Sequence, residues 1–356
     1  MTTARIALPL VLALAAAATL PRDVAAAEGT IVIKLGTVAP AGSKWERVLA
    51  EMGQQWRDAS GGLVKLQIYA GGVAGDESDL VRGMGIGKQQ AASLTVVGLS
   101  NIVAEPQALC VPQLLTSNEE LDYVRGKLTP ELDAKIAKRG YTVLHWADAG
   151  WLRFFSTKPF THPDAMKPMK IFVWTGETGS IEIWKDRGYK PVPLAATDIT
   201  LSLQSGLIDV VPMTALMALS TQSNLIAKYV IDYRWAPLVG ATIVRTETWE
   251  RIPADMRPKL LAIAAEAGEK LRKEVRQLDD DAITSMRSKG LIIQTVTPEE
   301  ATAWAKLAEN AHARIRAEVV DPASFDEVKR LRDEFRASRA GGAPQAAPGA
   351  QSPAQP

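Results

Sequence analysis

Segments with the pattern of buried β-strands alternate with amphipathic helical segments along most of this chain, and this alternation constrains the fold more than any other feature. The first two strands are predicted at residues 31–36 and 64–69. Between them, Ser43 and Glu46 form the capping-box pattern that starts a helix. A third buried strand is predicted at residues 91–99. Strands separated by single helices favour a largely parallel sheet, so we predict an α/β fold.

Length and charge limit the number of domains and the classes of partner. The chain has 41 basic and 40 acidic residues, a formal net charge of +1. The basic residues are scattered, so no nucleic-acid partner is expected. Without its two ends the chain has about 310 residues, which suits two lobes of about 150 residues each better than one core. A continuous helical pattern over residues 253–288 predicts one long or kinked helix.

The two ends of the chain differ from the rest. Arg5, the apolar run of residues 6–20 and the small residues 25–27 form the pattern of a secretory signal peptide. We therefore expect export, cleavage before Glu28 and a soluble periplasmic protein. Cys110 is the one cysteine of the sequence, so neither a lipid-anchored N-terminus nor an internal disulfide is expected. Residues 339–356 contain mainly Ala, Gly, Pro, Gln and Ser, which predicts a disordered tail.

The residue patterns that accompany catalysis are missing from the sequence. The three histidines, His145, His162 and His312, form no H-E-x-x-H motif and have no neighbouring cysteine pair, so no metal site is expected. Neither a G-x-S-x-G nucleophile motif nor a phosphate-binding glycine motif occurs. We expect a protein that is not an enzyme and that uses no cofactor.

Five segments resemble, in order, motifs of the solute-binding proteins of tripartite ATP-independent periplasmic (TRAP) transporters, the DctP-like family. Residues 150–159, G-W-L-R-F-F-S-T-K-P, resemble a family segment that carries an Arg, a Ser and a Lys-Pro pair. Residues 169–173, M-K-I-F-V, resemble the family's L-K-I-R-V, and residues 203–209, L-Q-S-G-L-I-D, resemble L-Q-x-G-x-V-D. Residues 62–75 and 111–120 supply the other two matches. One match alone is weak, but five in order over residues 31–336 are specific.

The resemblance implies a two-lobed periplasmic solute-binding protein fold with a cleft between the lobes and a long connecting helix. It implies lobe I at residues 28–149 and 234–275, and lobe II at residues 150–233 and 276–338. The lobes are expected to close around a small ligand, because binding energy selects the closed state. The closed form is then expected to deliver the ligand to a small and a large membrane subunit of a TRAP transporter.

The site that the resemblance implies differs from the family's at its most diagnostic position. The family uses the arginine of L-K-I-R-V to hold a ligand carboxylate through two hydrogen bonds. This sequence has Phe172 there, and a phenyl ring cannot make that contact. Arg153 matches the family's other arginine. It either anchors an anion alone or packs between the lobes, and the sequence does not decide between these roles.

Other positions of the implied pocket are also apolar or aromatic. Two valines and one methionine replace polar groups that are common in the family, and three tryptophans lie close to the matched segments. Each tryptophan could instead pack in the core. The predicted ligand-binding residues are Arg153, Phe172, Trp174, Trp151, Val38, Val97, Met213 and Trp235. They predict a neutral, hydrophobic or aromatic ligand rather than a simple dicarboxylate.

The sequence leaves other functions open. Binding proteins of ABC-type importers use the same kind of fold, and the sequence does not separate them from TRAP delivery. An envelope scaffold or sensor that uses the fold without transport is the main alternative. An enzyme is the least expected, because no nucleophile–base pair or metal set is visible.

Overall fold

The computed structural model describes residues 29–175 and 177–340. The predicted signal peptide and residues 341–356 of the predicted tail lie outside this range, whereas residues 339 and 340 belong to the last helix. The strands form a ten-stranded sheet in the order β2-β1-β3-β9-β4-β7-β5-β6, with β8 paired to both β4 and β10. The strands are β1 Ile31–Thr37, β2 Val64–Tyr69, β3 Ala91–Thr95, β4 Tyr141–Ser156, β5 Lys170–Trp174, β6 Lys190–Leu194, β7 Val210–Thr214, β8 Tyr229–Ile231, β9 Ala236–Arg245 and β10 Ile292–Gln294.

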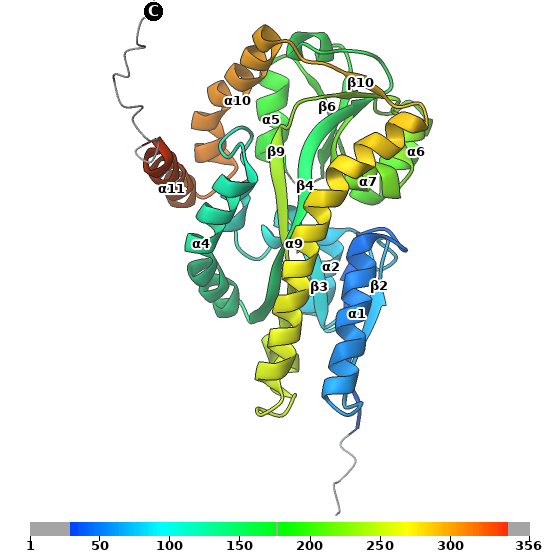
Figure 1. The fold of residues 1–356 in the computed structure, drawn as a ribbon, viewed down its shortest axis with the longest axis vertical. Helices are drawn as coiled ribbons and strands as arrows, with labels where there is room; N and C mark the ends of the chain where they lie inside the picture. Colours follow the sequence, from blue (N-terminus) through cyan, green and yellow to red (C-terminus); the bar gives the residue numbers. More distant parts are fainter. Residues whose placement is uncertain (1–28, 176, 341–356) are drawn as a thin grey trace, which may run out of the picture.

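Helices cover the sheet and fill the connections (Figure 1). The α-helices are α1 Lys44–Ala59, α2 Glu77–Gly85, α3 Val96–Leu99, α4 Asn118–Lys138, α5 Thr178–Asp186, α6 Ile199–Gln204, α7 Ala215–Ser220, α8 Thr246–Glu250, α9 Arg257–Ser288, α10 Pro298–Glu318 and α11 Pro322–Ala340. Four short 3-10 turns are η1 Glu105–Cys110, η2 Pro163–Met166, η3 Ala196–Asp198 and η4 Ser223–Leu225. The predicted α/β fold class is confirmed.

Two parallel groups of strands are joined by a long antiparallel pair. Strands β1, β2 and β3 are parallel to one another, and so are β5, β6 and β7. Strand β9 pairs with β3 and with the first part of β4, while the last part of β4 pairs with β7. The chain therefore passes between the two groups along β4 and β9, as expected for a two-lobed protein.

Helix α9 links the same two groups on the outside of the sheet. It runs in Figure 1 from beside α1, across β4, to the neighbourhood of α7 and β10. Its first half places Leu260 and Leu271 in a core with Ile33, whereas its second half places Met286 in a core with Val211. This is the predicted long helix, which begins at Arg257. The predicted lobe boundaries remain a proposal that this division of the core supports.

Strand β4 bends where it passes from one group to the other. Its pairing with β9 is irregular between Asp148 and Gly150, and Gly150 has φ +111°. A side chain there would lie 3.1 Å from Asp279 Oδ1 and 3.3 Å from Thr214 Cβ. Glycine is therefore required at this bend by both its backbone conformation and the close approach of its neighbours.

Local signals explain most element boundaries, and one prediction is wrong. The Ser43 hydroxyl accepts a hydrogen bond from the Glu46 amide at the start of α1, as expected for a cap. The strand predicted at residues 91–99 ends at Thr95, and helix α3 follows. The Thr95 side chain caps α3 by accepting from the Val97 amide at 3.2 Å. An apolar run of this length suits both a strand and a helix, so periodicity alone missed the break.

Candidate functional site

Two adjoining cavities meet at the carboxyl end of β5. The tryptophan cavity, about 180 Å³, is named for Trp174, Trp184 and Trp235 in its wall. The methionine cavity, about 100 Å³, is named for Met213 and Met217. Both cavities share the side chains of Leu152, Phe172, Trp174, Pro212 and Leu238. The carboxyl ends of parallel strands are the usual place for ligands in α/β folds, so this is the candidate binding cleft.

Both groups of strands contribute to the cleft wall. Val38 follows β1 and faces the methionine cavity, opposite Met213 of β7 and Ala196 of η3. The tryptophan cavity lies between the segment that contains Val97 and helices α5 and α10. A ligand in either cavity would thus contact both predicted lobes, which is the arrangement that couples binding to lobe closure.

Phe172 is buried and lines both cavities. It is 1% exposed, and its ring lies 5.4 Å from the Trp174 ring in an edge-on arrangement. Trp174 Nε1 is buried and has no hydrogen-bond partner among residues 29–175 and 177–340. A buried donor without a partner is costly, so a ligand that offers an acceptor here would remove that cost.

Six of the eight predicted site residues line the cleft. They are Val38, Val97, Phe172, Trp174, Met213 and Trp235. Trp151 does not: its Nε1 donates to Asn118 Oδ1 at 2.8 Å, and the Arg234 guanidinium lies over its ring.

Arg153 is also outside both cavities. It donates from Nη1 to Asp279 Oδ2 at 2.6 Å and is 5% exposed. Successive side chains of a strand point to opposite faces, so Leu152 faces the cleft and Arg153 faces α9. Asp279 Oδ1 also accepts from the Ala215 amide, which ties β4, α9 and α7 together. Arg153 thus packs between elements and lines neither cavity, and its predicted contact with a ligand remains a prediction.

The sequence reasoning missed one face of helix α5 and its preceding residue. Glu177, Ser180, Trp184 and Arg187 all line the tryptophan cavity. They recur at intervals of three and four residues, which is the spacing of one helix face, so a helical pattern of mixed polar and aromatic residues was the available signal. Arg187 Nη2 donates to the carbonyl oxygen of Asn310 at 2.6 Å.

Two carboxyl groups line the cleft, buried Glu77 in the methionine cavity and half-buried Glu177 in the tryptophan cavity. Glu77 lines the methionine cavity and accepts from the Thr95 amide at 2.8 Å and the Gly98 amide at 2.6 Å. Burial raises the pKa of Glu77 to about 7, against the effect of these hydrogen bonds. Burial, and secondly the charge of Glu77, raises the pKa of Glu177 to about 7. Neither group has a basic partner in the described part of the chain.

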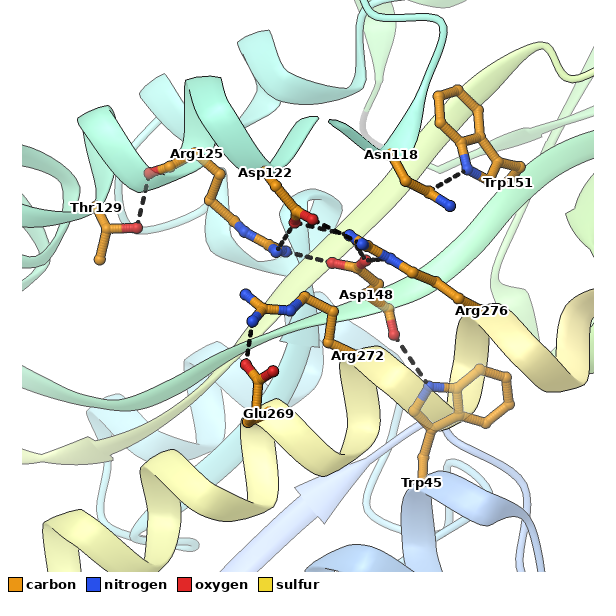
Figure 2. A network of polar contacts seen from close by, with 10 residues as sticks. All are labelled: Trp45, Asn118, Asp122, Arg125, Thr129, Asp148, Trp151, Glu269, Arg272 and Arg276. Carbon is orange, nitrogen blue, oxygen red and sulfur yellow. Dashed lines mark hydrogen bonds and ion pairs between the residues drawn. The ribbon is translucent and has the colours of Figure 1, made fainter. Parts of the chain in front are cut away.

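A charged network lies beside the bend of β4 (Figure 2), and its Asp148 also lines the methionine cavity. Asp148 of β4 pairs with Arg125 of α4 and with Arg276 of α9, whose Nε lies 2.8 Å from Asp148 Oδ2. Asp122 of α4 accepts from both arginines, at 2.9 Å from Arg125 and 2.7 Å from Arg276. The Asp148 carbonyl oxygen accepts from Trp45 Nε1 at 3.5 Å. Two arginines and two aspartates thereby fix α4, β4 and α9 with no net charge.

The two predicted lobes touch over the methionine cavity. Asp76, before α2, accepts from the Ala196 amide at 3.3 Å through Oδ2. Gly72 approaches Thr197 so closely that an added Cβ would lie 2.4 Å from Thr197 Cγ2. These contacts join the loop after β2 to the turn after β6 and cover this side of the cleft.

The described residues show neither a cluster of metal-binding side chains nor a membrane-spanning helix. Residues 29–175 and 177–340 contain no group of three or more His, Cys, Asp or Glu side chains placed to hold a metal ion. Over the same ranges no helix is both long enough and apolar enough to cross a membrane.

Comparison with solved structures gives the same class of protein. A TRAP periplasmic solute-binding protein from Ralstonia eutropha, solved with bound (S)-2-acetolactate, has a TM-score of 0.79 at 19% identity. The match covers 86% of this chain and 100% of that one. A TRAP periplasmic solute-binding protein from Sulfurospirillum deleyianum with bound succinate has a TM-score of 0.77 at 20% identity, covering 85% and 98%. The fold is therefore that of the two-lobed periplasmic solute-binding proteins.

The family follows from the sequence itself. The model of the family described as bacterial extracellular solute-binding protein, family 7 (DctP) matches residues 35–318. The C4-dicarboxylate-binding periplasmic protein DctP of Rhodobacter capsulatus is 24% identical over 314 residues, which are 86% of this chain and 94% of that protein. This chain belongs to the DctP family of TRAP solute-binding proteins, whose members are binding proteins and not enzymes.

Proposed function

We propose that this chain is the periplasmic solute-binding component of a TRAP transporter. In this proposal the predicted signal peptide directs export, and the lobes close around a small ligand. The closed protein then delivers the ligand to a small and a large membrane subunit. The family match supports this role, and the cleft with walls from both predicted lobes supports the closure mechanism.

The ligand of this proposal is largely apolar or aromatic rather than a simple dicarboxylate. The observation that carries it is Phe172 at the junction of the two cavities, at the position where the family resemblance implies an arginine. Arg153 is not free to replace that arginine, because Asp279 holds it on the opposite face of β4. Both structural relatives described above bind carboxylates. A cleft wall of Phe172, Trp174 and Trp235 instead favours burial of apolar surface.

Calorimetric titration with succinate and a panel of uncharged aromatic solutes tests this ligand class. Wild-type protein is expected to bind members of the aromatic panel and not succinate. Phe172→Arg is expected to lose the aromatic solutes and gain succinate, while Phe172→Leu, which keeps the wall apolar, should retain the aromatic solutes. Tight succinate binding by the wild type that Phe172→Arg does not improve would contradict the proposal. Binding of no solute at all would favour an envelope scaffold.

A further inference from the structure

The tryptophan cavity combines aromatic rings with a carboxyl group that has no cationic partner. Phe172, Trp174, Trp184 and Trp235 supply the rings, and Glu177 supplies the acid. Arg187 is the one basic residue among the described side chains that line either cavity. Its guanidinium donates to the carbonyl oxygens of Asn310 and Ile183, so it does not neutralise Glu177.

A carboxylate in a largely apolar cavity wall is unfavourable without a cationic partner, and a second acid nearby makes it more so. Ser180 hydrogen-bonds to Glu177, and the negative charge of Glu77 acts on Glu177 and raises its pKa. A positive charge between these groups would be attracted to both. Arg187, the one cation among the described lining side chains, is bonded to backbone carbonyl oxygens, so a positive charge against Glu177 would come with the ligand.

We infer that the ligand carries a protonated amine, which lies against Glu177 while its apolar body fills the tryptophan cavity. Rings around a cationic group add a second attraction, because the negative face of an indole or phenyl ring favours a cation within about 6 Å. Phe172, Trp174 and Glu177 all line the tryptophan cavity, so the acid and the rings border the same space. This inference rests on the proposed function and specifies its ligand class.

The size of the cavity sets the size of the amine. At about 180 Å³, the tryptophan cavity is somewhat larger than the roughly 150 Å³ cavity that accommodates a benzene molecule. One aromatic ring with a short amino-terminated chain is therefore the simplest matching probe.

The test compares three probes that share a phenyl ring and differ in their polar group. They are 2-phenylethylamine, 2-phenylethanol and phenylacetate, titrated calorimetrically into the exported protein at neutral pH. The amine is expected to bind at least about tenfold more tightly than the alcohol, and phenylacetate is expected not to bind. Glu177→Gln should lower the affinity for the amine to that for the alcohol and leave the alcohol unchanged. Glu182→Gln, an exposed acid of the same helix, is the matched control and should behave as wild type.

The outcomes separate this inference from the proposed function. Equal binding of amine and alcohol by the wild type would overturn the amine assignment and leave an apolar-ligand protein. Retention of the amine preference in a folded Glu177→Gln variant, with an unchanged thermal midpoint, would also overturn it. Binding of phenylacetate alone would overturn both the inference and the proposed ligand class.

Discussion

Asp148→Asn is expected to lower the free energy of unfolding by about 3 kcal/mol, the lower end of the range for breaking a buried ion pair. The Asp148 side chain is 4% exposed, and it accepts hydrogen bonds from Arg125 and Arg276. An asparagine keeps one acceptor oxygen but removes the charge. Arg125, with a side chain 5% exposed, would then have only the more exposed Asp122 to balance it.

The control for this prediction is Asp122→Asn in the same network. Asp122 is 39% exposed, so water already screens its interaction with the two arginines. Its loss should therefore cost about 1 kcal/mol or less. The two variants remove the same charge from the same pair of arginines, and differ mainly in burial.

Urea unfolding followed by tryptophan fluorescence measures both variants against the wild type. We expect a clearly lower urea midpoint for Asp148→Asn than for the wild type. The dependence of the free energy of unfolding on urea concentration should be similar for all three proteins. A loss below about 1 kcal/mol for Asp148→Asn, or an equal loss for both variants, would refute the argument that burial sets the cost.

Three further predictions concern protonation and closure. Burial lowers the pKa of His145 from 6.5 to about 4. The unfolded chain therefore binds a proton more readily than the folded one. Between pH 6.5 and 4, the free energy of unfolding of the wild type, measured with urea, should fall by roughly 3 kcal/mol more than that of His145→Leu. The same pH dependence for both proteins would contradict this. Burial raises the pKa of Cys110 to about 12, so iodoacetamide at pH 8 should add mass only to unfolded protein. In small-angle scattering, Gly72→Ala should have a larger radius of gyration than wild type, because its Cβ would clash with Thr197 Cγ2 and hold the lobes apart. Adding Thr197→Ser, which removes Cγ2, should partly restore the closed form.

Much of the fold could be predicted because its signals are local. Ser43 and Thr297 start α1 and α10, and each side chain accepts the amide hydrogen bond that its cap pattern predicts. The long helix was visible from its periodicity alone. The length of β4 was not, because Gly150 and Asp148 interrupt its apolar pattern at the bend between the two groups of strands.

The site was only partly predictable, because sequence position does not fix which face of an element a residue occupies. Motif matching led to Phe172 and its neighbours in the cleft wall. It also led to Arg153. Whether that side chain points toward the cavities or toward α9 depends on the register of β4, which the motif does not fix. Glu77 and Glu177 were missed, because an acidic residue near a helix start is usually exposed, and only the assembled fold shows that these two line the cleft.

Mass spectrometry of the ligand released from the cleft can show directly whether this protein carries an apolar solute. The full sequence, including the predicted signal peptide, is expressed, released gently from the periplasm and denatured after purification, in parallel with Phe172→Asp. We expect one organic species with an apolar body, present in wild-type protein and absent from the variant. Small dicarboxylates in the wild type, or the same species in both proteins, would contradict it.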